Sequence, residues 1–95
     1  METAVGPIAS IISDKLTAAF RPIRLNLVDD SARHQGHAGH NPAGESHFNL
    51  VIESPAFTGM SRVARQRAVY AALREELAGP LHALSVKALA PGESD

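Results

Sequence analysis

The chain has 95 residues, of which 44% are hydrophobic, and its nine basic and ten acidic side chains give a net charge of −1. This length predicts one domain with an aliphatic core of its own. The charge balance disfavours strong non-specific binding to nucleic acid, which requires an excess of positive charge. Because the chain has no cysteine, a disulfide framework, a cysteine-type zinc finger and thiol redox catalysis are excluded.

The sequence also lacks the usual signals for a membrane or for secretion. No apolar run approaches the roughly 20 residues that a membrane helix requires. The first five residues lack the basic stretch of a signal peptide. We therefore expect a protein of the bacterial cytoplasm or of an organelle matrix, with no membrane contact.

The first half of the chain predicts one helix and two strands. Apolar residues at helical spacing, such as Ile8, Ile12 and Leu16, predict a helix from about residue 7 to residue 19. Alternating apolar residues predict strands over residues 23–28 and 48–53, with Ile23, Leu25 and Leu27 facing the core in the first and Phe48, Leu50 and Ile52 in the second. The segment between them, residues 31–44, is rich in Gly and His and is expected to be a mobile loop.

The second half predicts a longer helix and a third strand. Ser61 is a candidate N-cap for a helix over residues 63–77, which Gly79 and Pro80 terminate. Val69, Ala72, Leu73 and Leu77 are expected to face the sheet. A strand over residues 81–89 follows, and residues 91–95 form a polar tail that we expect to be mobile. The ordered core is therefore expected over about residues 7–90.

These elements predict an α+β domain of order α-β-β-α-β. The first two strands are joined by a loop and are expected to pair antiparallel. A helical crossover makes the third strand parallel to the second. The expected architecture is a three-stranded mixed sheet with both helices on one face.

Five histidines are the most distinctive side chains for chemistry. His34, His37 and His40 recur every third residue in the loop, His47 is expected to be exposed at the start of the second strand, and His82 stands at the head of the third. Since the chain has no thiolate, a soft metal centre would have to use imidazoles. A histidine on a strand is more often a hydrogen-bonded residue at the edge of a core, and for His82 the alternation with Leu84 predicts partial burial. A His-rich loop is more often a solvated connection.

A second group of candidates is basic. Arg62, Arg65 and Arg67 open the second predicted helix and form a basic group, for which the family resemblance described below suggests a role in contacting nucleic acid. The plainer interpretation is an ordinary solvated face, with Arg62, Arg65 and Arg74 offset by Glu75 and Glu76. The chain shows no catalytic triad, cysteine nucleophile or phosphate-binding glycine motif, so an enzyme is not expected.

Five short motifs in their order along the chain resemble the BolA family, and the similarity covers almost the whole chain. They are Asp30-Ser-Ala-Arg-His-Gln-Gly-His37, Glu45-Ser-His-Phe48, Phe57-Thr-Gly59, Arg65-Gln-Arg67 and Leu81-His-Ala-Leu84. The family pattern at the fourth motif is usually Arg-His-Arg, so Gln66 departs from it and puts in doubt any role of that histidine. The resemblance implies a class II KH-like fold, which agrees with the predicted element order.

The resemblance also implies a partner and a cofactor. BolA-like proteins pair with monothiol glutaredoxins as heterodimers and share a [2Fe–2S] cluster, held on the other side by the glutaredoxin cysteine and a glutathione thiolate. The matching ligands here are His82 and His34, with His37 as a backup, and the work implied is iron–sulfur cluster trafficking or iron regulation. Two alternatives stay open. One is a DNA-binding transcriptional regulator that uses Arg62, Arg65 and Arg67, and the other is a metal-free complex with glutaredoxin.

Overall fold

The computed structural model describes residues 6–29, 47–79 and 81–93. The helices and strands in chain order are α1 (Pro7–Phe20), β1 (Arg24–Asp29), β2 (His47–Glu53), the 3₁₀ turn η2 (Pro55–Phe57), α2 (Arg62–Ala72), α3 (Arg74–Ala78) and β3 (Ala83–Leu89). The predicted order α-β-β-α-β is confirmed, with the second helix in two pieces. Within these residues, no helix is long and apolar enough to cross a membrane.

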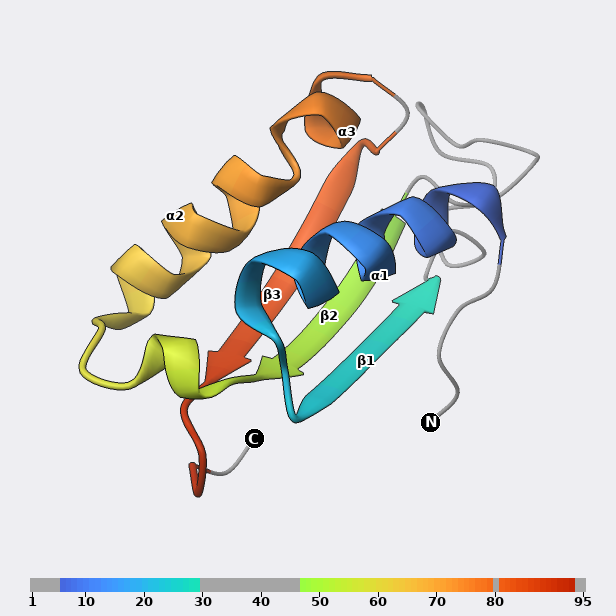
Figure 1. The fold of residues 1–95 in the computed structure, drawn as a ribbon. Coiled ribbons are helices and arrows are strands. Elements are labelled where there is room, and N and C mark those ends of the chain that lie inside the picture. The colour runs from blue at the N-terminus through green and yellow to red at the C-terminus, as the bar shows by residue number, and fades with distance from the viewer. Residues whose placement is uncertain (1–5, 30–46, 80, 94–95) are drawn as a thin grey trace.

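The sheet has the order β1-β2-β3, with β2 in the centre. β1 runs antiparallel to β2, with Leu27 opposite Leu50. β3 runs parallel to β2, with Val86 opposite Leu50. Both predicted pairings are confirmed, and the parallel pair results from the helical crossover through α2 and α3 (Figure 1).

The helices cover one face of the sheet, as predicted (Figure 1). Alternation along the strands sends Leu27, Phe48, Leu50 and Ile52 into the space between sheet and helices, where each is at most 2% exposed. Helical spacing sends Ile12, Leu16, Val69 and Leu73 into the same space from α1 and α2. The predicted core is therefore formed as a single cluster. Ile23 is an exception, because it precedes β1 and is 63% exposed.

One continuous helix was predicted over residues 63–77. This prediction is wrong, because the structure has two helices there, α2 and α3. The helix is interrupted at Leu73, whose N–H is shared between the carbonyls of Val69 and Tyr70, each at 3.2 Å. α3 then carries Glu75 and Glu76, and the Lys15 ammonium of α1 binds both carboxylates at 2.9 Å. The break thus accompanies a contact between the first and last helices that the helical pattern alone does not reveal.

The C-terminal residues after β3 form a turn. The Glu93 N–H donates to the Ala90 carbonyl over 3.1 Å, and Gly92 has a φ of +90°, a conformation that suits glycine. This turn lies in the stretch that the sequence assigned to a polar tail. It brings Glu93 back toward α2, with consequences described below.

Candidate functional site

Two histidines meet at the end of the sheet where the parallel strands β2 and β3 begin. His47 is the first residue of β2 and lies opposite Ala83, the first residue of β3. His82 immediately precedes that strand. The two imidazole rings lie 6.0 Å apart between centroids and are inclined by 62°. Residues 35 positions apart in the sequence therefore form one histidine pair.

The two rings differ in exposure. His82 is exposed, whereas His47 is half-buried. The predicted partial burial of His82 and the predicted exposure of His47 are both wrong. The reason for His82 is that β3 begins at Ala83, two residues later than expected, and Leu81 fills the core position instead. Leu81 is fully buried, and its N–H donates to the Glu76 carbonyl over 2.9 Å.

The loop histidines His34, His37 and His40 lie outside the described residues, so their predicted roles stay predictions. The residues on either side of that segment are described. Asp29 ends β1 opposite Phe48, and Phe48 in turn lies opposite Leu84 of β3. The segment carrying the three histidines is therefore attached to the sheet at the same end as His82.

The chemistry available at this end is that of imidazole nitrogens. They bind iron, zinc and nickel, and two histidines replace two cysteines at one iron of Rieske-type clusters. No group of three or more His, Asp or Glu side chains suitable for a metal occurs within residues 6–29, 47–79 and 81–93. The described part of this end is thus a partial ligand set, which further donors would have to complete.

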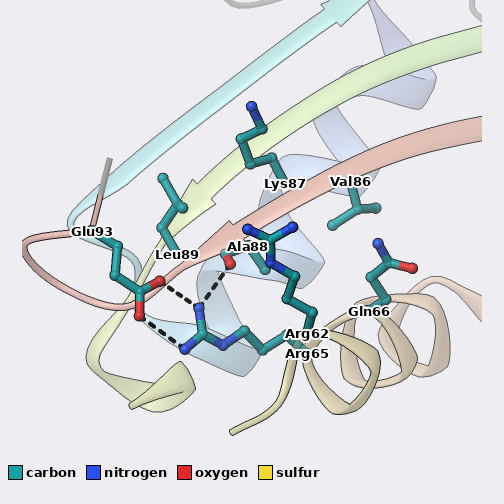
Figure 2. A pocket seen from close by; sticks show the side chains of 8 residues that line it. All are labelled: Arg62, Arg65, Gln66, Val86, Lys87, Ala88, Leu89 and Glu93. Atoms are coloured by element: carbon teal, nitrogen blue, oxygen red, sulfur yellow. Dashed lines mark hydrogen bonds and ion pairs between the residues drawn. The ribbon is translucent and has the colours of Figure 1, made fainter. Parts of the chain in front are cut away.

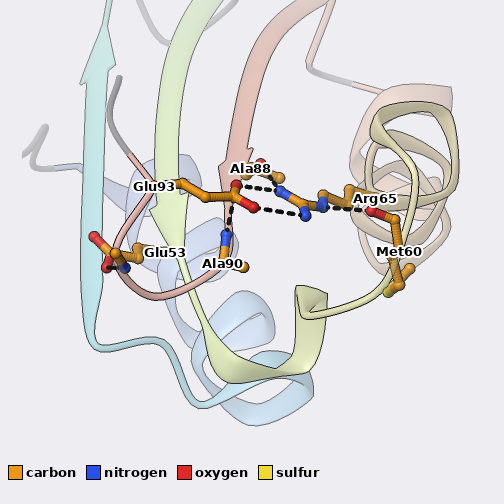
Figure 3. A network of polar contacts seen from close by, with 7 residues as sticks. Glu53, Met60, Arg65, Ala88, Ala90 and Glu93 are labelled. Atoms are coloured by element: carbon orange, nitrogen blue, oxygen red, sulfur yellow. Dashed lines mark hydrogen bonds and ion pairs between the residues drawn. The ribbon is translucent and has the colours of Figure 1, made fainter.

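The opposite end of the sheet is organised around Arg65. Its side chain is only 10% exposed, and its guanidinium binds both carboxylate oxygens of Glu93 at 2.6 and 3.1 Å (Figure 3). It also donates to the carbonyls of Met60 and Ala88, each at 3.0 Å. One side chain therefore joins the loop before α2, strand β3 and the C-terminal turn.

The pairing with Arg65 perturbs the carboxylate strongly. Mainly through the hydrogen bonds from Arg65, with a further one from the Ala90 N–H, the pKa of Glu93 is lowered from 4.5 to about 2. The same pair raises the pKa of Arg65. Arg65 is thus committed to contacts inside the molecule, and its interpretation as a surface charge is wrong.

The other two arginines of the predicted patch behave differently. Arg62 and Arg67 are exposed. The Ser61 side chain accepts a hydrogen bond from the Ala64 N–H at 3.1 Å, which confirms the predicted N-cap and fixes the start of α2. Arg62 faces a groove of about 550 Å³ between α2 and the second half of β3 (Figure 2).

Sequence reasoning missed Glu93 and Lys87, which line this groove together with Arg62. Nothing in the local sequence distinguishes Glu93 from other tail residues, because its partner is 28 positions away. Glu76 was also assigned to the surface and is instead 9% exposed, where it is bound by Lys15. An isolated acidic residue carries no sequence signal for such long-range pairing.

Comparison with known proteins supports the family suggested by the motifs. The family described as BolA-like protein matches residues 16–93. "BolA-like protein 1" of Pongo abelii is 43% identical over 90 residues, which cover 95% of this chain and 63% of that protein, so the chain spans less than two thirds of this relative. "DNA-binding transcriptional regulator BolA" of Escherichia coli is 45% identical over 75 residues, covering 79% of this chain and 68% of that protein.

A solved structure has the same fold. The "BolA domain of SufE1 from Arabidopsis thaliana" superposes with a TM-score of 0.84 at 44% identity, covering 96% of this chain and all of that one. The family match itself begins at residue 16, within α1, and ends at residue 93, in the C-terminal turn. The chain belongs to the BolA-like family.

Proposed function

We propose that this protein binds a monothiol glutaredoxin and completes a shared [2Fe–2S] cluster through His82 and His34. The proposal rests on the family and on one observation, the exposed imidazole of His82 at the end of the sheet where the segment carrying His34 is attached. It makes the protein an adaptor without catalytic turnover, acting in iron–sulfur cluster trafficking or iron regulation.

The described residues fit such a role. His82 follows a fully buried anchor, Leu81, so its backbone is held while its ring reaches solvent. An exposed ligand at the end of a sheet leaves the remaining coordination positions of an iron open to a partner. His37 is the backup for His34, since it lies in the same segment. His47 lies beside His82 and limits the directions from which another ligand can approach it.

The cluster would supply a redox-active, visibly coloured group held on its other side by a glutaredoxin cysteine and a glutathione thiolate. Imidazole ligands raise the potential of such clusters relative to all-thiolate ligation. This chain's part is to donate an imidazole nitrogen and to present it immediately before β3, next to the buried Leu81. If the protein binds glutaredoxin without a metal, the shared cluster is wrong and the binding partner alone is right.

The test is an anaerobic titration of this protein into cluster-loaded, glutathione-bound monothiol glutaredoxin, followed by visible circular dichroism. We expect a new spectrum that saturates at one-to-one. His34→Ala and His37→Ala are compared in parallel, and loss of the new spectrum with His34→Ala alone identifies the loop ligand. Complex formation without a spectral change would contradict the shared cluster.

DNA binding is the second candidate function, because the Escherichia coli relative is named as a DNA-binding transcriptional regulator. Arg62 and Arg67 are exposed and face solvent, whereas Arg65 is held by Glu93 and is not available to phosphate. Phosphate contacts predict that affinity for duplex DNA falls steeply with salt and falls again in an Arg62→Gln, Arg67→Gln double variant. If the affinity for DNA changes neither with salt nor in the double variant, DNA binding through these arginines is excluded.

A further inference from the structure

The groove between α2 and β3 has a chemistry that the cluster proposal does not use. It is lined by Arg62 and Gln66 from α2 and by Val86, Lys87, Ala88 and Leu89 from β3, with the Lys87 side chain on the opposite side of the strand from Val86 (Figure 2). Arg62 and Lys87 are exposed, and within the described residues neither forms a salt bridge. Two cations therefore flank a partly aliphatic groove.

The groove already holds one carboxylate. Glu93 closes one end of it, bound by Arg65 in a two-point interaction at 2.6 and 3.1 Å. Arg62 lies close enough to contribute to lowering the pKa of Glu93. Planar guanidinium groups match carboxylates in this two-point geometry. The pairing of Arg65 with Glu93 shows that a carboxylate fits in this groove. The neighbouring cations, Arg62 and Lys87, could bind a carboxylate of another molecule.

We propose that this groove is a docking site for an acidic, extended segment of a partner protein, with carboxylates on Arg62 and Lys87 and aliphatic side chains against Val86 and Ala88. The segment is held by side chains, not by addition of a strand to the edge of β3. Two carbonyls of β3 are already occupied, that of Leu84 by the Tyr70 hydroxyl at 3.0 Å and that of Ala88 by Arg65.

The lining favours a peptide over single-stranded nucleic acid. The described residues that line the groove include no aromatic side chain, so they offer bases no stacking platform. Among the described residues that line the groove, Arg62 and Lys87 are the cations left to neutralise phosphates, since Arg65 is paired with Glu93. A peptide with aliphatic residues between acidic ones can pack its aliphatic side chains against Val86. A phosphodiester backbone has no apolar groups to pack there.

The test uses fluorescence anisotropy with the full chain and a labelled eight-residue peptide in which glutamate alternates with leucine and valine. Its probe controls are the same peptide with glutamine in place of glutamate and an eight-nucleotide oligothymidylate. The groove variant is Arg62→Gln with Lys87→Gln. The matched control is Arg67→Gln with Arg74→Gln, which removes the same charge from exposed positions outside the groove.

We expect the acidic peptide to bind and the groove variant to weaken it about fivefold, as the loss of two exposed charge pairs predicts. The matched control should bind as the unmodified protein does. Equal weakening in both variants, tighter binding of oligothymidylate, or equal binding of the glutamine peptide would each overturn the proposal. His34 and His82 are intact in all three proteins, the unmodified chain and the two double variants, so cluster sharing, measured separately, can fail or succeed independently of this result.

Discussion

The two ends of the sheet are built in opposite ways. At one end, the exposed His82 and the half-buried His47 meet where β2 and β3 begin. At the other end, Arg65 and Glu93 are tied into a network that joins α2, β3 and the C-terminal turn. Arg65 stabilises the fold and is surrounded by its hydrogen-bond partners, whereas His82 is exposed and accessible to another molecule. The following predictions separate these roles.

Removing the Arg65 guanidinium should have the largest effect on stability. Arg65→Met leaves the carbonyls of Met60 and Ala88 without their donor and releases the carboxylate of Glu93. We expect the thermal unfolding midpoint, followed by far-ultraviolet circular dichroism, to fall by several degrees. Arg67→Met, an exposed position on the same helix, should stay within about 3 °C of the unmodified protein. Equal midpoints for the two variants would show that the network is not structural.

Ser54, immediately after β2 at the same end, should come next. It is fully buried, its hydroxyl donates to the Phe20 carbonyl over 2.6 Å, and it accepts from the Ala56 N–H at 3.1 Å. Ser54→Ala leaves both groups unpaired, so the free energy of unfolding in urea should fall by about 1–3 kcal/mol. Ser85→Ala, at an exposed position of β3, is the matched control and should change little. A Ser54 effect no larger than that of Ser85 would contradict this account.

The Glu93 carboxylate predicts a smaller, pH-dependent effect. Its pKa is lowered from 4.5 to about 2 in the fold, so its stabilising contribution is present above pH 4.5 and is lost as the pH falls toward 2. Urea unfolding of the unmodified protein and of Glu93→Gln, compared across this range, should therefore converge at the acid end. A stability difference that stays constant between pH 6 and pH 2 would rule out the ion pair as its source.

The histidine end should show the smallest effect on stability. Because His82 is exposed, His82→Ala should change the free energy of unfolding by less than about 0.5 kcal/mol, measured by urea titration. A large loss would show that His82 supports the fold, contrary to its proposed role as a ligand. The expected result also provides a folded variant for the test of function.

Much of the fold could be predicted from the sequence. Period-two alternation along β1 and β2 and helical spacing in α1 gave the elements, and the crossover rule gave the parallel pairing of β3. The break at Leu73 and the late start of β3 were not predictable from periodicity. They accompany tertiary contacts, of Lys15 with Glu76 and of Leu81 with the core, that periodicity does not report.

The candidate sites could be predicted in residue type but not in environment. The resemblance to the BolA family identified His82 as a candidate ligand, and the group of arginines at the start of the second helix identified Arg65. The expected exposure of each was wrong. Side-chain alternation is a local rule, whereas the burial of Arg65 depends on Glu93, which a glycine turn 28 residues later returns to α2. Sequence patterns do not report such long-range pairing.

The most direct test of the central claim is the visible circular dichroism of cluster-loaded monothiol glutaredoxin mixed anaerobically with His82→Ala. His40→Ala, which changes another histidine of the chain, is the control. We predict that the control reproduces the spectrum of the complex with the unmodified protein and that His82→Ala leaves the spectrum of glutaredoxin alone. If His82→Ala gives the same spectrum as the unmodified protein, His82 is not a cluster ligand and the account is wrong.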